Sequence, residues 1–580
     1  MKNLVKVAAL SICSIVLVAC GDSFLTRDPF GSTITQEQYA AMSNQLEGSL
    51  RGIYSMLARY KLDSEAHDEF GRRSLDLYCD LMSGDIALTD HKYGWFYSDE
   101  MGQGNTGRTG FIWTYYYGML RNVNSVILIA KGGDAASADN VIKRIAASGL
   151  PNKYDSKKGE YYTISGTDTV ATFTESEAKV AYYYAQALSL RGYIYSNLLM
   201  LYCETPRHID DFKRERCFPM YNELNMEMAQ GLATMAEVYT QLESDLTEAI
   251  DYFEAFNKIE RSSKIEVDAS IAEAFLAYSY LNKGNPKQNP SFDDYKTAYT
   301  NARDYALKAI ASSSCKVLSI RDLTETGFNN VSNTSWMWGE DVTIETTGGL
   351  ASWFGQCDIH SYSYAWSGDT KAIDENLYKL IADSTSTAGK PNGHPFDARV
   401  NWFNDGSGNS VYKYCGDGKF YSAQCPTSTK ADDIDREWLS DNVFMRIEMM
   451  YLIAAEASYR LGNDDDAITY LRAITDERVL TGKETEYDNY IDGLNHNNLL
   501  AEIEYNWRVE LWGEGYSLMT FRRLSAETPE RRRGANHGAN GGSKMEAGSS
   551  HIFVMPSAEG SYNPSVNQAP RRSPKQLKQH

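Results

Sequence analysis

The sequence predicts a mostly α-helical protein, in which a scaffold of antiparallel helix pairs carries a loop-rich insertion with short strands. Apolar residues recur at steps of three or four along Ala40–Leu318 and Asn442–Leu524, which is the period of helices that bury one face. Two stretches inside these regions resemble each other. Between the two regions, Arg321–Asp441 loses the helical period and is rich in Gly, Ser, Thr, Asn, Trp and Tyr.

The N-terminus has the layout of a secretory signal peptide, with Lys2 and Lys6 before the apolar stretch Val7–Ala19. A transmembrane span is the alternative, but crossing a bilayer takes about 20 apolar residues, and this stretch is shorter. Leu17-Val18-Ala19-Cys20 resembles a bacterial lipobox, whose cysteine takes a diacylglycerol. We therefore expect Cys20 to be the lipidated N-terminus of the mature chain, followed by a tether.

Amphipathic helices are expected first at Ala185–Tyr202, ended by Pro206, and at Gln241–Phe253. The two similar stretches follow, at Ala274–Ile310 and Leu452–Ile474. Each reads as a helix closed by Gly-Asn and then a second helix, which resembles a tetratricopeptide pair. We expect the closing glycines, Gly284 and Gly462, to be left-handed helix caps. The acidic run Asp464-Asp465-Asp466 suits a helix N-terminus.

Composition and charge exclude several function classes. The 580 residues carry a formal net charge of −20, and the densest basic run is Arg531-Arg532-Arg533, so nucleic-acid binding is not expected. The nine cysteines are irregularly spaced and form no zinc pattern. Two disulfides remain open, Cys415 with Cys425 and Cys203 with Cys217. Aromatic residues make up 12% of the chain, and their flat apolar faces suit both core packing and stacking on sugars.

Motifs that would indicate a cofactor or catalysis are incomplete. The G-x-G-x-x-G run at residues 102–107 follows no buried strand, so it reads as a loop. The calcium-like loop that begins at Asp405 has Gly416 where a bidentate Glu is required, which leaves calcium a weak alternative. Glu448 and Glu456 would lie about 12 Å apart on a helix, and we expect them to pair with Arg446 and Arg508. No cofactor, metal site or enzyme activity is predicted.

Taken in order, the motifs resemble the SusD/RagB family of outer-membrane nutrient-binding lipoproteins. The resemblance runs nearly end to end, although Tyr516, Thr520 and Ala569 depart from the family pattern. It rests on the following pieces: Trp113-x-x-x-Tyr117 to Asn124, Leu190–Tyr193 with Leu201–Pro206, Asp397-Ala398-Arg399, Met445–Leu452 with Ala455–Ala457, Arg508–Gly515, and the tail from Met555-Pro556 to Asn567–Pro570.

The resemblance implies a SusD-like fold and a cell-surface lipoprotein of the outer membrane. Such a protein captures a glycan and passes it to a SusC-like TonB-dependent transporter. Peptide capture in the manner of RagB is the alternative, and a surface hydrolase is a weaker one. The implied ligand contacts lie before the Trp113 helix and in the insertion. They are Trp95, Phe96, Tyr97, Asn105, Trp336, Trp338, Trp353, Tyr362, Tyr364 and Trp366, with Asp85 and Arg72 as polar candidates.

These expectations divide the chain into six segments. They are a signal peptide at residues 1–19, a lipidated N-terminus and tether at 20–45, a helical scaffold at 46–318, a loop-rich ligand-binding insertion at 319–441, more helical scaffold at 442–524, and a mobile loop with a C-terminal closing segment at 525–580.

Overall fold

The structure is a computed structural model of the chain. It describes residues 45–58, 67–90, 92, 96, 107–132, 140–209, 211–284, 295–326, 328–343, 345–360, 362–382, 393–404, 412–420, 438–548 and 551–568. The predicted signal peptide, the predicted lipidation site Cys20, the loop at Asp405 and Cys425 lie outside these residues.

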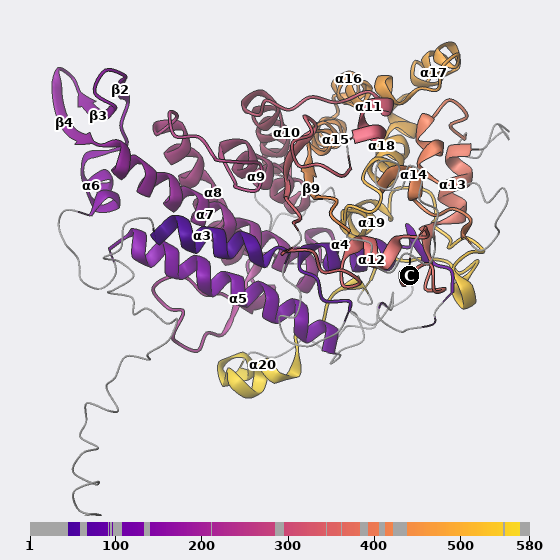
Figure 1. Ribbon diagram of the computed structural model, residues 1–580, viewed down its shortest axis with the longest axis horizontal. Coiled ribbons are helices and arrows are strands. Elements are labelled where there is room, and N and C mark those ends of the chain that lie inside the picture. The colour runs from indigo at the N-terminus through magenta and orange to yellow at the C-terminus, as the bar shows by residue number, and fades with distance from the viewer. Residues whose placement is uncertain are drawn as a thin grey trace, which may run out of the picture.

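Helices dominate, as the sequence predicts (Figure 1). The N-terminal and central helices are α3 (Gln45–Met56), α4 (Arg72–Met82), α5 (Gly107–Ala130), α6 (Val141–Ser148), α7 (Glu175–Tyr202), α8 (Met235–Ala255), α9 (Ala269–Lys283) and α10 (Tyr295–Ser312). The insertion holds α11 (Ile320–Thr326), α12 (Trp353–Cys357), α13 (Glu375–Ala382) and α14 (Asp417–Phe420). The C-terminal helices are α15 (Ile447–Arg460), α16 (Asp464–Thr475), α17 (Glu484–Ile491), α18 (His496–Glu510), α19 (Ser517–Leu524) and α20 (Ser557–Tyr562).

The strands are short and form small antiparallel sheets. Strand β1 (Ile86–Leu88) pairs with β8 (Lys371–Ile373), and β7 (Trp336–Glu340) pairs with β9 (Asn442–Arg446). Strands β2 (Lys153–Asp155), β3 (Glu160–Ser165) and β4 (Asp168–Phe173) form a meander, and β5 (Arg216–Pro219) pairs with β6 (Leu232–Thr234). Both β1–β8 and β7–β9 join the insertion to the helical scaffold.

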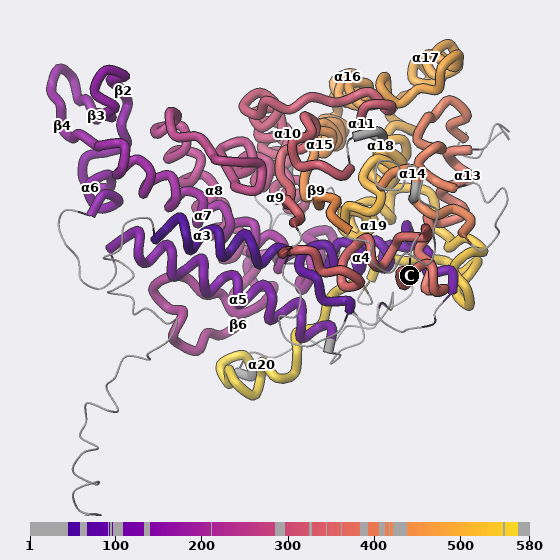
Figure 2. Tube along the Cα trace, viewed as in Figure 1, coloured from indigo at the N-terminus to yellow at the C-terminus, as the bar shows by residue number. Residues whose placement is uncertain are grey.

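The scaffold is a row of helix pairs that continues past the insertion. Helix α7 packs on α8, α9 on α10, and α15 on α16, while α10 also packs on α15. Figure 1 shows this row running from α7 and α8 across to α16, and Figure 2 shows the insertion lying around α12 to α14. The two stretches that resemble each other in sequence are therefore the pairs α9–α10 and α15–α16, which stand next to each other although the insertion separates them.

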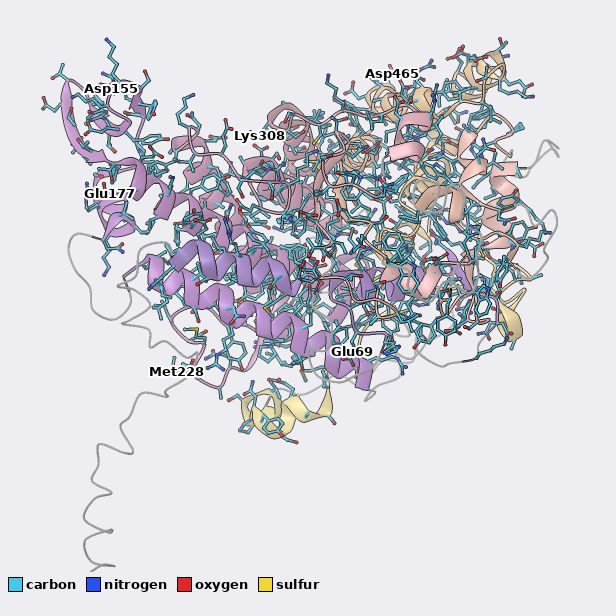
Figure 3. All side chains as sticks on the ribbon, viewed as in Figure 1. Glu69, Asp155, Glu177, Met228, Lys308 and Asp465 are labelled. Carbon is cyan, nitrogen blue, oxygen red and sulfur yellow. The ribbon has the colours of Figure 1, made fainter. Side chains whose placement is uncertain are left out.

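The two glycines expected to cap these pairs behave differently. Gly462 has φ +80° and is the left-handed cap that the sequence predicts. Gly284 has φ −57°, so that prediction is wrong for it. The physical reason for Gly284 is a close approach, since a Cβ there would lie 2.3 Å from Cε1 of Tyr299. The acidic run opens α16 as expected, and Figure 3 shows Asp465 at the outer edge of the molecule.

A buried cluster of charges joins the insertion to the C-terminal helices. Glu510, at the end of α18, accepts hydrogen bonds from Arg446 Nη1 at 3.1 Å, Arg478 Nη2 at 2.9 Å and Arg399 Nη1 at 3.2 Å. Burial alone would raise the pKa of Glu510, but Arg478 and Arg446 hold this pKa well below its ordinary value. The carboxylate therefore stays charged and holds three segments together.

The expected partners of the two α15 carboxylates are half right. Glu448 does pair with Arg446, at 3.0 Å. Glu456 pairs instead with Arg523 at 2.6 Å, and Arg508 pairs with Asp85 at 2.7 Å. The helix period places a residue on a face, but it does not say which distant helix will face it.

The C-terminal segment differs from the mobile loop that its composition suggests. Within residues 525–548, the Gly534 N–H donates to Asp374 Oδ1 at 2.5 Å and Asn536 Nδ2 donates to the Ile373 carbonyl at 2.8 Å. These bonds fasten the segment to α13 and β8. In the parts of the chain described above, no helix combines the length and the apolar composition that a membrane crossing requires.

The contact between α7 and α8 depends on a glycine. A Cβ at Gly192 would lie 2.5 Å from Cγ of the buried Leu246. We expect Gly192→Ala to lower the free energy of unfolding by about 1–3 kcal/mol, because overpacking forces the two helices apart. A Cβ at Gly110, within α5, would meet no atom within 4 Å, so Gly110→Ala is the matched control and should be neutral or stabilising by up to about 1 kcal/mol. Denaturant unfolding of the two variants tests this, and equal stability would contradict the packing argument.

Glu340, at the end of β7, gives the fold a pH dependence. Its side chain accepts a hydrogen bond from Asn442 Nδ2 at 2.9 Å, and burial raises its pKa to about 7. The folded state thus favours the protonated carboxyl, and the stability linked to that proton is complete below about pH 4.5 and is lost as the pH rises through about 7.

We expect Glu340→Gln to remove this dependence. The variant should gain stability relative to the unmodified protein between pH 4.5 and pH 8, by up to about 3 kcal/mol. The measurement is the difference in unfolding free energy between the two proteins across that pH range. A difference that stays constant with pH would show that Glu340 titrates normally.

Candidate functional site

The insertion builds one compact turn around α12. Ser352 caps this helix by accepting the Gly355 N–H at 3.0 Å. After α12 the chain turns back on itself, and the Tyr364 N–H donates to the Gly355 carbonyl at 3.0 Å. Asp358 holds the turn from inside, since its Oδ1 accepts the His360 N–H at 2.7 Å and its Oδ2 accepts Trp438 Nε1–H at 2.9 Å.

Two aromatic side chains stand on the outside of this turn. The Ser367 N–H donates to the Ser363 carbonyl at 3.0 Å, which makes one helical turn. Tyr362 directly precedes this turn and Trp366 lies on it, and the two rings lie on the same side. Their ring centroids are 5.9 Å apart with 52° between the planes. Tyr362 is 45% exposed, and Trp366 is half-buried.

Neighbouring segments complete this surface. Tyr412 is half-buried and donates its hydroxyl to the Trp366 carbonyl at 3.2 Å. Lys92 is exposed, and its Nζ donates to the Ser367 carbonyl at 3.4 Å. We call Tyr362, Trp366, Tyr412 and Lys92 the aromatic surface. Sequence reasoning missed Tyr412 and Lys92, although Lys92 stands only three residues before the predicted Trp95.

The aromatic surface rests on a buried ion pair. Lys371 Nζ lies 3.3 Å from Asp369 Oδ2 and donates to both the carbonyl and the side-chain oxygen of Gln356, at 3.2 and 3.1 Å. The Lys92 N–H approaches Asp369 Oδ1 at 3.4 Å, and the Thr89 N–H donates to the Thr370 carbonyl at 2.9 Å. The loop after β1 is thereby fixed against the base of the turn.

Most of the other predicted aromatic contacts are core residues, and this corrects the expectation that they form an exposed platform. Trp336, Trp338 and Trp353 are at most 1% exposed, and Phe96 is fully buried. Trp338 packs edge-to-face against Tyr193 and donates its Nε1–H to the Ile265 carbonyl at 2.8 Å. A ring covered by protein on its faces stacks on no ligand, and these four rings stabilise the junction between insertion and scaffold.

Tyr364 and the two polar candidates are also internal. Tyr364 is buried and hydrogen-bonds His67 Nδ1 through its hydroxyl. Arg72 donates to the Phe444 carbonyl at 2.7 Å and to the Tyr516 hydroxyl at 3.0 Å, while Asp85 pairs with Arg508. Arg72 and Asp85 are thus structural in this conformation. Trp95, Tyr97 and Asn105 lie outside the described residues, and their predicted role stays a prediction.

A concave region lies elsewhere, between α13, α18 and residues 527–532, with a volume of about 1380 Å³. Its charged walls are paired, since His394 Nε2 lies 2.8 Å from Glu502 Oε2 and Arg460 Nη1 lies 2.5 Å from Glu527 Oε2. Burial alone would raise the pKa of Glu502, but His394 lowers it below its ordinary value. The described residues contain no group of three or more His, Cys, Asp or Glu side chains that could hold a metal ion.

Comparison with known proteins supports the fold. A model of the SusD family matches residues 358–574, and a model described as "Starch-binding associating with outer membrane" matches residues 163–289. No curated protein matches the sequence.

Solved structures match over nearly the whole chain. A SusD-like carbohydrate binding protein from Bacteroides vulgatus is 20% identical with a TM-score of 0.62, covering 91% of this chain and 97% of its own. A SusD superfamily protein from Bacteroides thetaiotaomicron is 18% identical with a TM-score of 0.62, covering 91% and 99%. A SusD superfamily protein from Bacteroides fragilis is 15% identical with a TM-score of 0.57, covering 91% and 99%.

The helix pairs, the insertion that interrupts them and the two matching family models agree with one another and with the resemblance seen in the sequence. The chain belongs to the SusD/RagB family.

Proposed function

We propose that this protein binds a glycan at the cell surface, with the aromatic surface as its contact. The observation that carries the proposal is the pair Tyr362 and Trp366, which project to the same side of a rigid turn beside the loop after β1. The axial C–H groups of a sugar ring form an apolar face that stacks on such rings. Lys92 stands at the edge, where its ammonium can donate to sugar hydroxyls.

The chemistry of the aromatic surface favours capture over cleavage. The nearby carboxylates of Asp358 and Asp369 are fully buried, and each is engaged by protein groups, Trp438 and Lys371 respectively. Glycoside hydrolysis needs two carboxyl groups that reach the substrate. Affinity for the glycan should be modest, because sugar hydroxyls already bond well to water.

We further propose that Cys20 carries a lipid that anchors the protein in the outer membrane, and that the captured ligand passes to a SusC-like TonB-dependent transporter. The lipobox-like sequence before Cys20 supports the anchor, and the name of the matching family model supports the membrane. Uptake of a captured glycan needs a transporter, because moving its many hydroxyl groups from water into the bilayer core is too costly.

Removal of the exposed rings tests the binding site. We expect Trp366→Ala and Tyr362→Ala each to weaken binding of the recognised glycan about tenfold or more, equal to about 1.4 kcal/mol. Tyr562→Ala is the matched control, because Tyr562 is an 88% exposed tyrosine on α20 outside the aromatic surface. Calorimetry of the mature protein in detergent against a panel of polysaccharides and peptides gives the measurement.

The panel also separates the alternatives. Binding of peptides but no polysaccharide, lost in the same two variants, would replace the glycan by a peptide ligand. If both variants still bind the glycan as the unmodified protein does, the binding site lies outside the aromatic surface. If the thermal unfolding midpoints of all three variants equal that of the unmodified protein, the substitutions leave the fold intact.

Replacement of Cys20 tests the anchor. We expect Cys20→Ala to leave glycan binding unchanged and to shift the protein from the membrane fraction to the soluble fraction, because stable attachment needs acyl chains that each contribute about 0.8 kcal/mol per buried CH₂. The measurement is fractionation followed by intact mass. Retention of the variant in membranes of cells that lack the transporter would contradict the lipid anchor.

A further inference from the structure

Exposed apolar side chains gather on one edge of the molecule. Among the described residues five large apolar side chains are strongly exposed, and three of them, Leu224 at 78%, Met228 at 57% and Tyr562 at 88%, lie on two neighbouring segments. We call these three the apolar patch. Figure 1 shows α20, which carries Tyr562, at the lower edge, and Met228, labelled in Figure 3, lies on the same edge. Single exposed apolar residues need no explanation, but a group of them marks a contact surface.

Hydrogen bonds hold the two segments of the apolar patch side by side. Asn563, directly after Tyr562, donates through Nδ2 to the Tyr221 hydroxyl at 3.1 Å and to the Gln230 carbonyl at 2.8 Å. Tyr221 and Gln230 stand at the two ends of the loop that carries Leu224 and Met228. One amide group therefore ties α20 to both ends of this loop.

Both segments are also fastened to α5. Trp113 donates its Nε1–H to Glu559 Oε2 of α20 at 3.1 Å. In the loop, Glu227 lies 3.3 Å from Arg121 of α5, and both side chains are exposed. The apolar patch is thus held on the scaffold, and the charged pair on its loop is internally neutralised.

The chain continues from the apolar patch into a basic stretch of sequence. A short 3-10 helix at Pro564–Gln568 follows α20 and ends the described part of the chain. Residues 569–580 lie outside the described residues, and their sequence holds four basic residues and no acidic one: Arg571, Arg572, Lys575 and Lys578. This is a local excess of positive charge in a chain whose formal net charge is −20.

We propose that the apolar patch rests on an anionic lipid surface, with its three side chains in the interfacial layer and the basic residues after Gln568 against the phosphate groups. Binding to a membrane surface strengthens with the apolar area buried and with attraction to anionic lipids. Tyrosine suits the headgroup level, because its ring is apolar and its hydroxyl is polar. Contact with a membrane in the cell rests on the proposed location of the protein, whereas affinity of the apolar patch for lipid does not.

The size of the apolar patch favours a lipid surface over a protein partner. In a stable protein complex each partner buries about 800 Å², contributed by about 20–30 residues, and three side chains supply a small part of this. A bilayer needs no matching shape. Cys20 precedes Gln45, the first described residue, by 25 residues, and such a length of chain spans at most about 90 Å. The proposed anchor therefore keeps the apolar patch near the bilayer, where a weak contact suffices.

Vesicle flotation tests the contact without the anchor. The protein is the full mature chain with Cys20→Ala, and the vesicles contain equal parts of phosphatidylglycerol and phosphatidylcholine. We expect the protein to float with these vesicles at low salt. It should float far less with vesicles of phosphatidylcholine alone, or at high salt, because salt screens the attraction between basic residues and phosphates.

Substitutions in this chain test each part of the contact. Leu224→Ser together with Tyr562→Ser should weaken binding about tenfold or more, because two apolar side chains no longer leave water. Val170→Ser is the matched control, since Val170 is 54% exposed on β4, far from α20 in Figure 1, and this variant should bind as the parent chain does. Arg571→Gln with Arg572→Gln should weaken binding and reduce its dependence on salt.

Two results would overturn the proposal. If the Leu224→Ser, Tyr562→Ser variant floats as well as the Val170→Ser control, the apolar patch is not the contact. If the parent chain floats with neither kind of vesicle, lipid is not the occupant, and a dimer in solution that the double variant abolishes would assign the patch to a second copy of this chain. The assay contains no glycan and no acyl chain on the protein, so its failure is separate from failure of the proposed glycan binding or of the anchor.

Discussion

The fold depends on buried charges that must neutralise one another. Moving a charge out of water costs several kcal/mol even after the protein relaxes, so each buried side chain here needs a partner of opposite sign at close range. Glu510 satisfies three arginines at once, and their geometry is tight enough to hold its pKa below its ordinary value against the effect of burial. Burial acts on Lys419 in the opposite direction, because it disfavours the charged ammonium. It lowers the pKa of Lys419 to about 8, although Glu514 lies 2.8 Å away. The members of this cluster are Asp397, Arg399, Lys419, Arg446, Glu448, Arg478, Glu510 and Glu514.

This cluster explains how an insertion can carry a rigid surface. Arg399 and Lys419 belong to the insertion, and their partners Glu510 and Glu514 belong to the chain around the end of α18. The insertion therefore cannot lift from the scaffold without exposing unpaired charges. The same junction is filled by tryptophans that the sequence alone suggests for ligand contact. What remains outside is the outer turn of the insertion, with Tyr362 and Trp366, and it is rigid because its inner residues are fixed.

The sequence determines much of this architecture, and the limits have physical causes. Helix periodicity finds the helix pairs, because burying one face is a local property of the chain. The order of the motifs along the chain indicates the family. Exposure of a tryptophan is not local, so Trp338 and Trp366 look alike in sequence although one is the centre of the core and the other lies at the surface. Gly284 shows the same limit. A side chain at this position would collide with Tyr299 on another helix, and this cannot be read from the local sequence. Arg508 finds Asp85 rather than Glu456, because the partner is set by which helices cross.

Rigidity of this kind suits recognition better than catalysis. A catalytic carboxyl must change its protonation state during each cycle, which requires an environment that lets its pKa approach the working pH. Around the aromatic surface the carboxylates of Asp358 and Asp369 serve the fold instead, because each accepts hydrogen bonds that hold the turn. Because protein groups hold these two buried carboxylates, neither is placed to transfer a proton to a bound ligand. An exposed ring pair has no such conflict, since stacking requires only that the ring faces stay in place. The buried charges that fasten the insertion therefore favour a surface that holds its ligand and leaves it chemically unchanged.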